Sequence, residues 1–364
     1  MRILAIDIGT GTQDILVFDA ASPITNCPKM VMPSPTATLA ARILAATQRK
    51  DHILFTGFTM GGGPSTWAVK QHIKAGFKVF ATPAAARTFD DDPAEVQRMG
   101  IVAVSEDEAK SLQGAVTMEL KDVDLASIGR ALAIFGVSQR FDLVAVAVLD
   151  HGAAPPGVSD RAFRFEHMLR RLRDCNDLLA FTYLCGEIPD YLTRMTSVEK
   201  SLVPEYRTLL MDTGFAAVTG ADEDPLVSRH KHRIIINLGN SHTIAFHLNG
   251  LAVLGMFEHH TRALDRKALE TAVSGLADGS LTNTDVFESG GHGAVVLKVS
   301  SRRHFVAAVG PQRGRLSGSS LYPYFAVPHG DMMIAGCFGL VRACALRIAD
   351  WREEIQAALS REES

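Results

Sequence analysis

The stretch RILAIDIGTGTQDILVFD at residues 2–19 decides the fold that we expect. Two apolar runs flank a turn of glycine and threonine at 9–12, a pattern typical of a β-hairpin. The same plan returns much later in the chain, in RIIINLGNSHTIAFHL at 233–248. Each copy reads as a strand, a polar turn and a second strand. The sequence therefore contains a weak internal repeat, at an offset near 231 residues.

The repeat extends beyond the hairpins. Placing Asp7 on Asn237 and Gly9 on Gly239, an offset of 230, also brings the strand residues 4–6 onto 234–236. After the first copy we expect a third strand at 29–32 and a helix at 36–49. After the second copy the same order follows, with a strand at 251–257 and a helix at 263–277. We therefore predict two like domains that face each other, at residues 1–200 and 201–364.

The residues between the two copies alternate between strand and helix patterns, which indicates an α/β fold. Apolar runs predict strands at 53–55 and 77–80, and the most continuous run, at 143–149, predicts a buried strand. Pro64 and Pro93 each open a helix-like stretch. A loop is expected at 150–165, before a basic helix that runs through Arg173, and the domain junction is expected between about 190 and 231.

Composition sets limits on the class of protein. The chain has 364 residues, of which 47% are hydrophobic and 21% charged, enough apolar surface for a two-domain globular protein. A net charge of −3 without a long basic block argues against nucleic acid as a partner. The longest apolar runs are too short to cross a membrane. Five widely spaced cysteines fit a reducing cytoplasm, and nothing in the sequence predicts the oligomeric state.

Each hairpin turn offers the chemistry that a polyphosphate needs. A polar side chain ends a buried strand, and the glycine-rich turn behind it exposes consecutive backbone N–H groups. In the first copy Asp7 would hold a Mg²⁺ ion through water, while Thr10, Gly11 and Thr12 approach the phosphates. Asp14 would orient a water molecule or support the metal ligands. The alternative is an ordinary hairpin in which these residues satisfy only the geometry of the turn.

DIGTGTQD at 7–14 and NLGNSHT at 237–243 resemble the two phosphate-binding hairpins of the actin, heat-shock-chaperone and sugar-kinase ATPase superfamily. The resemblance implies two ribonuclease H-like domains around an interdomain cleft, with ATP and Mg²⁺ bound between them. The residues that it implies for phosphate binding are Gly9, Thr10, Gly11, Thr12, Gly239, Asn240 and Ser241.

GDMMIAGCFGLVRA at 330–343 resembles the adenosine motif of the same superfamily. That motif is a strand that runs into a glycine-containing turn and a helix, so the resemblance implies that Gly336 and Gly339 let the backbone approach the nucleotide. The alternative is an ordinary strand-to-helix turn.

Four further stretches together resemble a narrower family, labelled as pyruvate formate-lyase activating enzymes. They are DHGAAPPGVSDRAFRF, MDTGFAAVTGA, GGHGA and GDMMIAGCFGL. Activators of that kind cleave S-adenosylmethionine with an iron–sulfur cluster that three closely spaced cysteines hold. This chain lacks such a triplet, so the residues do not predict a radical S-adenosylmethionine enzyme.

The second hairpin departs from the superfamily pattern at Asn237, where a carboxylate is usual. An amide binds phosphate or water but carries no charge, so hydrolysis would be slow or another group would supply the base. His242 and His292 are candidates for that base, although each could instead be a structural, hydrogen-bonded histidine. Nucleotide binding is therefore better supported than nucleotide turnover.

The stretch from 150 to 165 contains His151, Arg161 and Arg164, which would suit a carboxylate or phosphate substrate, with His292 as a further contact. The alternative is that the two arginines pair with local acids such as Asp150 and Asp160.

Two other patterns are weaker. MDTG at 211–214 matches the way aspartic proteases present one carboxylate, but a turn in which Asp212 caps the next helix explains it as well. The pairs His230/His232 and His259/His260 lack a carboxylate or cysteine at ligand spacing, which argues against a metal site there.

These residues predict an ATP- and Mg²⁺-dependent phosphotransferase or ATPase, in which Asp7, Asp14 and Asn237 act at the phosphates. A nucleotide-gated binding or activating protein with little turnover is the alternative, and a scaffold that has kept only the fold is a third. The partner would be a small-molecule substrate or another protein, which the sequence does not identify.

Overall fold

The computed structural model describes residues 1–202, 205–300 and 304–360. Its first sheet has the strand order β3-β2-β1-β8-β10-β9. β1 pairs antiparallel with β2 and parallel with β8, and β10 continues parallel to β8. The strands are β1 (Arg2–Ile8), β2 (Thr12–Asp19), β3 (Lys29–Pro33), β8 (Leu143–Val148), β9 (Thr182–Leu184) and β10 (Thr208–Asp212). Every residue of β8 is buried, as the apolar run predicts.

The second sheet repeats this topology, with the order β14-β13-β12-β11-β15-β16. β11 pairs antiparallel with β12 and parallel with β15, as β1 does with β2 and β8. The strands are β11 (His232–Leu238), β12 (His242–Asn249), β13 (Ala252–His260), β14 (Gly293–Val296), β15 (Phe305–Val309) and β16 (Tyr324–Phe325). When β9 is left out of the first sheet and β14 out of the second, the five remaining strands of each sheet, counted along the chain, lie in the order 3-2-1-4-5. In each sheet the second of these strands is antiparallel to the first. The duplicated topology confirms the expected ribonuclease H-like, actin-like ATPase fold.

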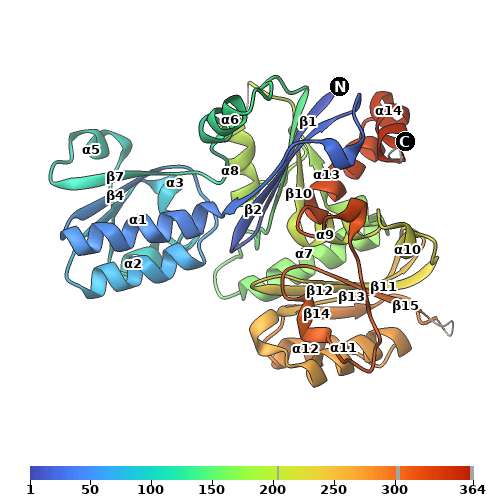
Figure 1. Ribbon diagram of the computed structural model, residues 1–364. Coiled ribbons are helices and arrows are strands. Elements are labelled where there is room, and N and C mark those ends of the chain that lie inside the picture. The colour runs from blue at the N-terminus through green and yellow to red at the C-terminus, as the bar shows by residue number, and fades with distance from the viewer. Residues whose placement is uncertain (203–204, 301–303, 361–364) are drawn as a thin grey trace.

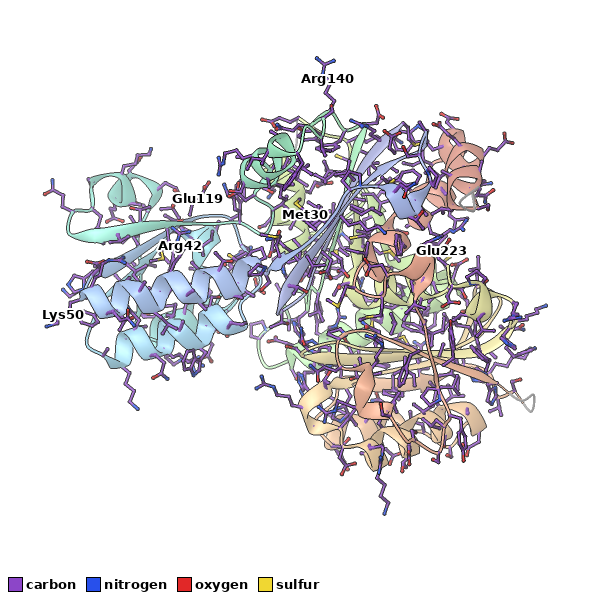
Figure 2. The ribbon with its side chains drawn as sticks, viewed as in Figure 1. Met30, Arg42, Lys50, Glu119, Arg140 and Glu223 are labelled. Atoms are coloured by element: carbon purple, nitrogen blue, oxygen red, sulfur yellow. The ribbon has the colours of Figure 1, made fainter. Side chains whose placement is uncertain are left out.

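A third, all-parallel sheet is inserted between β3 and β8, and the strand patterns of the sequence do not predict that these strands form a sheet of their own. Its order is β6-β5-β4-β7. The strands are β4 (His52–Gly57), β5 (Val79–Ala81), β6 (Ile101–Ala103) and β7 (Ala115–Leu120). The helices of this segment are α1 (Pro35–Arg49), α2 (Pro64–Lys74), α3 (Pro83–Ala86), α4 (Pro93–Arg98) and α5 (Glu106–Ser111). Figure 1 shows this inserted unit to one side of the first sheet, and Figure 2 shows Arg42 on its helix α1 and Lys50 directly after that helix.

The other helices cover the two main sheets. They are α6 (Leu125–Ile134), α7 (Asp160–Asp174), α8 (Thr193–Leu202), α9 (Thr213–Ala221), α10 (Pro225–Ser228), α11 (Arg266–Asp278), α12 (Asn283–Glu288), α13 (Ala335–Arg347) and α14 (Arg352–Leu359). The prediction of a loop at 150–165 is wrong for the second half of this stretch, because α7 begins at Asp160 and contains both Arg161 and Arg164. Figure 1 shows α9 and α13 between the first and second sheets.

Helices α9 and α13 cross in close contact, and glycines make this possible. A Cβ atom on Gly220 would overlap the carbonyl of Ala335, and one on Gly339 would overlap the carbonyl of Ala216. The adenosine-motif prediction is therefore wrong for Gly339, which packs helix against helix. It is also wrong in its strand, because a 3-10 turn at Pro328–Gly330 and a short turn precede α13.

The division at residue 200 stays a prediction. In the strand pairing, the first sheet extends to β10 and so to Asp212. Among the described residues, no helix is both long and apolar enough to cross a membrane.

Candidate functional site

The two hairpin turns have the same local geometry. The N–H of Gly9 donates to the carbonyl of Thr12, and the N–H of Gly239 donates to the carbonyl of His242, each at 2.9 Å. Both pairs close the turn between the first two strands of a sheet. The structural offset is therefore 230 residues, and Asn237 occupies the position that Asp7 holds in the first hairpin.

The two turns face and touch each other. The hydroxyl of Ser241 donates to that of Thr10 at 3.0 Å. Gly11 lies beside Asn240, because a Cβ atom at Gly11 would come within 2.6 Å of the Asn240 side-chain nitrogen. Two segments that are far apart in sequence therefore meet at one place, with their glycine-rich turns opposed.

Asp7 and Asp14 form a pair of carboxylates behind the first turn. The two residues lie directly opposite each other on β1 and β2. Burial raises the pKa of Asp7 to about 7. Burial, and then the neighbouring Asp7, raise the pKa of Asp14 to about 8. Thr213 donates to one oxygen of Asp7 at 2.6 Å.

One oxygen of Asp14, Oδ1, is buried and has no hydrogen-bond partner among the residues that the structure describes. Two adjacent buried carboxylates whose pKa values are both raised are a setting that a divalent cation stabilises, and oxygen ligands are those that Mg²⁺ prefers. The residues present therefore fit the expected Mg²⁺ ion.

Two adjoining cavities open at the hairpins. The smaller has a volume of about 80 Å³ and is lined by Asp7 and Asp14. The larger has a volume of about 690 Å³ and reaches the inserted unit. Both cavities are lined by Gly9, Thr10, Thr213, Asn237, Gly239 and Asn240. The smaller cavity has room for a phosphate group and a metal ion but not for a whole nucleotide, since pockets for such ligands measure roughly 300–1,000 Å³.

The predicted adenosine stretch contributes to the smaller cavity in part. Met332, Met333 and Gly336 line it, although Gly336 lies within helix α13. A Cβ atom on Gly336 would overlap the Asp7 carboxylate, so a glycine is needed at this position.

The wall of the larger cavity is rich in carboxylates. Asp90, Asp91, Asp92 and Glu95 come from the inserted unit, and Asp150 from the end of β8. Burial raises the pKa of Asp150 to about 6, and the N–H groups of Gly152 and Met195 donate to it. Arg87 and Arg194 also line this cavity, but its carboxylates outnumber them, so the wall does not suit the anionic substrate that Arg161 and Arg164 predicted.

Arg164 and Arg161 are engaged elsewhere, which corrects their assignment to the substrate. Arg164 is 2% exposed and makes two hydrogen bonds to Glu258, at 2.8 and 2.9 Å, and one to Asp212 at 2.7 Å. Burial raises the pKa of Glu258, but the adjacent Arg164 outweighs it and holds that pKa well below its ordinary range. Arg161 donates to the carbonyls of Phe287 and Gly291. The alternative, in which the arginines pair with the local acids Asp150 and Asp160, is also wrong. The carboxylate partners of Arg164 are Glu258 and Asp212, and its hydrogen bond to Asp150 goes to the backbone carbonyl.

A cluster of histidines lies beside the second hairpin, and sequence reasoning missed it as a group. His151 follows β8, His242 begins β12 and His292 precedes β14. The Nε2 atoms of His151 and His292 are 3.2 Å apart. Burial lowers the pKa of His242 to about 4, that of His292 to about 3, and that of His151 well below its ordinary value. Each of these residues was a candidate alone, but their spacing of about 50 to 90 residues gives no local motif.

Of the histidine pairs considered in the sequence, His230 stacks on Phe305 with ring centroids 4.1 Å apart. His259 contacts the hydroxyl of Ser289 at 3.2 Å. His260 lies next to the cluster, 4.9 Å from His292 between ring centroids.

Asp212 accepts a hydrogen bond from the N–H of Gly214 and caps α9, as the alternative reading of MDTG predicts.

The fold and the paired hairpins define a two-domain protein of the actin-like ATPase type. The chain belongs to the family described as "Putative pyruvate format-lyase activating enzyme (DUF1786)", whose model matches residues 60–315. No match is found among curated proteins. Among the described residues, none of the five cysteines belongs to a group of three potential metal ligands.

Solved structures of similar proteins include three that span nearly all of the chain. The ethanolamine utilization protein EutJ from Carboxydothermus hydrogenoformans is 11% identical, with 93% of this chain and 89% of that chain covered and a TM-score of 0.36. The ROK hexokinase from Thermus thermophilus is 12% identical, with 96% and 100% covered and a TM-score of 0.33. The activator of the 2-hydroxyisocaproyl-CoA dehydratase from Clostridium difficile, with bound ADPNP, is 11% identical, with 100% of both chains covered and a TM-score of 0.35. The duplicated strand order, rather than these low scores, identifies the fold.

Proposed function

We propose that the chain is an ATP- and Mg²⁺-dependent phosphotransferase or ATPase that binds the phosphates between its two hairpins. The observation that carries this proposal is the meeting of the duplicated turns at Thr10 and Ser241, directly in front of the buried Asp7 and Asp14. An isolated glycine-rich turn would be weak support. Two opposed turns beside a carboxylate pair supply hydrogen-bond donors and a cation site at the same place.

Each group has a distinct role in this proposal. The backbone N–H groups of both turns bind the phosphate oxygens, and Asp7 and Asp14 hold the metal ion. Mg²⁺ would neutralise the charge that develops on the transferred phosphoryl group. Asn237 faces both cavities and would position the phosphate or a water molecule through its amide.

We assign a different ligand to each of the two cavities. The nucleoside would lie on the side of the smaller cavity, against Met332 and Met333, once the turns move apart to admit it. The acceptor would occupy the larger cavity. Its carboxylate-rich wall accepts hydrogen bonds from hydroxyl or ammonium groups, so we expect a hydroxylated or cationic acceptor rather than an acid.

The second candidate is a nucleotide-gated binding or activating protein with little turnover, whose closure on ATP would signal to a partner. Asn237 favours this candidate, because it removes a charge from the position that Asp7 fills in the first hairpin. The contact between the turns also fits a protein that closes on its ligand.

Nucleotide binding is tested by calorimetry and thermal unfolding with MgATP. The parent should bind, and a ligand at 100 times its dissociation constant should add roughly 2.7 kcal/mol to the free energy of unfolding. Asp7→Asn, which keeps the shape of the side chain, should lose the Mg²⁺-dependent part of the affinity. Asp19→Asn, at the other end of the same hairpin, is the matched control and should bind like the parent. Absence of any response to millimolar MgATP would refute the proposal.

A further inference from the structure

We propose that His151, His242 and His292 form a binding site for a divalent transition metal ion of the Zn²⁺ class. One ligand nitrogen from each of the three lies within 4.8 Å of the other two. This is the one group of three potential metal ligands in the part of the chain that the structure describes. The proposal does not depend on nucleotide binding.

The distances suit a metal ion. Two imidazole nitrogens bound to one tetrahedral Zn²⁺ ion lie about 3.3 Å apart, since each Zn–N bond is roughly 2.0–2.1 Å. The Nε2 atoms of His151 and His292 are 3.2 Å apart. The third ligand nitrogen, on His242, lies within 4.8 Å of the other two.

The cluster as it stands leaves its polar atoms poorly satisfied. Nε2 of His242 and Nδ1 of His292 are buried, and neither has a hydrogen-bond partner among the described residues. His151 and His292 share a single contact between two Nε2 atoms, in which only one can donate. A cation between the rings would give His242 a partner and replace this contact, and buried polar groups normally have such a partner.

The surrounding charges favour a cation. Arg164 is buried between two carboxylates, Asp212 and Glu258, so this group carries one formal negative charge in excess. Glu258 is one of the charged groups that act on both His242 and His292. Arg164 acts on all three histidines in the opposite sense, but at His242 and His292 the effect of Glu258 is the larger of the two, so the excess carboxylate would stabilise a positive ion there.

The imidazole ligands determine which metal ions the site prefers, and the cavity leaves one coordination position of the ion open. Imidazole nitrogens suit Zn²⁺ and its first-row neighbours, whereas Mg²⁺ prefers oxygen. Three protein ligands with a fourth position open is the arrangement of zinc sites that bind water or substrate. His151 and His242 line the larger cavity, so the fourth position would face the space that we assign to the acceptor.

The three ligands also come from both halves of the molecule. His151 follows a strand of the first sheet, while His242 and His292 belong to the second. A bound ion would therefore connect the two domains across the cleft and oppose their separation.

The test is metal binding by an untagged, chelator-stripped chain in the absence of nucleotide. One equivalent of Zn²⁺ should bind per chain, and millimolar Mg²⁺ should not displace it. Co²⁺ should give the visible absorption of a tetrahedral or five-coordinate nitrogen site. His151→Gln and His242→Gln should each weaken Zn²⁺ binding by more than about 100-fold, since even the outer partners of metal ligands contribute 10–100-fold. His52→Gln, a histidine of the inserted unit, should bind like the parent.

Three results would overturn the proposal. They are no stoichiometric Zn²⁺ binding, an octahedral Co²⁺ spectrum, or an affinity that both histidine variants leave unchanged. The Co²⁺ spectrum is recorded on the parent, so it decides the question even if a variant fails to fold. A protein that binds Zn²⁺ but not MgATP would refute the proposed function and leave this site standing.

Discussion

At the scale of single residues, Asp7 and Asn237 occupy equivalent positions of two hairpins and differ by one charge. The difference decides what the site can do, because only Asp7 offers a carboxylate to a metal ion, while Asn237 offers an amide to phosphate or water. Asp7 lines the smaller cavity, and Asn237 lines both cavities. Position 237 is therefore where turnover and binding can be separated.

If the chain is an enzyme, Asn237→Ala should lower the rate of phosphoryl transfer by about 100-fold with little change in MgATP affinity, as for a group that acts mainly in the transition state. Asn237→Asp then tests the alternative. If hydrolysis by the parent is at background and Asn237→Asp raises it, the chain is a gated binder. Rates that are high and equal in all three proteins would show that position 237 does not act on the phosphates.

His167 gives a prediction for pH. It is buried in α7, where it contacts the hydroxyls of Tyr191 and Tyr183 at 2.9 and 3.1 Å. Burial lowers its pKa from 6.5 to about 4, so the unfolded chain takes up this proton first as pH falls. Its contribution to the free energy of unfolding is therefore lost as pH falls from about 6.5 to 4.

His167→Gln lacks this proton uptake. Buried carboxylates such as Asp150 act in the opposite direction over part of this range, so the comparison with the variant is more informative than the parent alone. The difference in unfolding free energy between parent and His167→Gln should shrink by about 2 kcal/mol between pH 7 and pH 4.5. Urea unfolding at the two pH values measures it, and a difference that stays constant would contradict a buried neutral histidine.

The sequence was most informative about residues that lie close together along the chain. Asp7, Gly9 and Asn237 could be predicted because each ends a strand or opens a turn within one short motif. The histidine cluster could not, since its three members come from separate segments and only the packing of the two domains joins them. Arg164 was assigned to a substrate for the same reason, because its partner Glu258 lies on a distant strand.

At the scale of elements, the crossing of α9 and α13 fixes how the first sheet meets the second. Gly220 and Gly339 allow the two backbones to touch, and small residues such as Ala216 and Ala335 lie opposite them. The strand-and-turn patterns of the sequence predicted the hairpins well. The resemblance of 330–343 to an adenosine motif gave Gly339 a nucleotide-binding role, because a glycine in a helix looks alike in sequence whether it faces a ligand or another helix.

Gly339→Ala should therefore destabilise the protein by about 1–3 kcal/mol, the usual cost of overpacking a buried contact. Gly314→Ala is the control, because a Cβ atom there would meet nothing within 4 Å, and its effect should stay within about 0.5 kcal/mol. Chemical denaturation of both variants provides the comparison. Equal stabilities would mean that the helices are not in backbone contact.

At the scale of the whole molecule, two sheets of one topology place their turns against each other, and an inserted unit closes the large cavity from the side. The internal repeat predicted the two sheets. It could not predict the inserted sheet, because β4 to β7 pair only with one another and single-strand patterns do not show which strands become neighbours. The acidic wall that this unit adds is the main reason to expect an acceptor that is not an acid.

The central claim is that one nucleotide binds between two hairpin turns that lie about 230 residues apart in the sequence. Hydrogen–deuterium exchange with and without saturating MgATP tests it most directly, because it reports on backbone amides in both turns at once. We predict slower exchange in peptides that contain residues 9–12 and in peptides that contain 239–241, with no change at β6 of the inserted unit. Protection confined to one turn, or absent from both while MgATP is bound, would contradict the proposal.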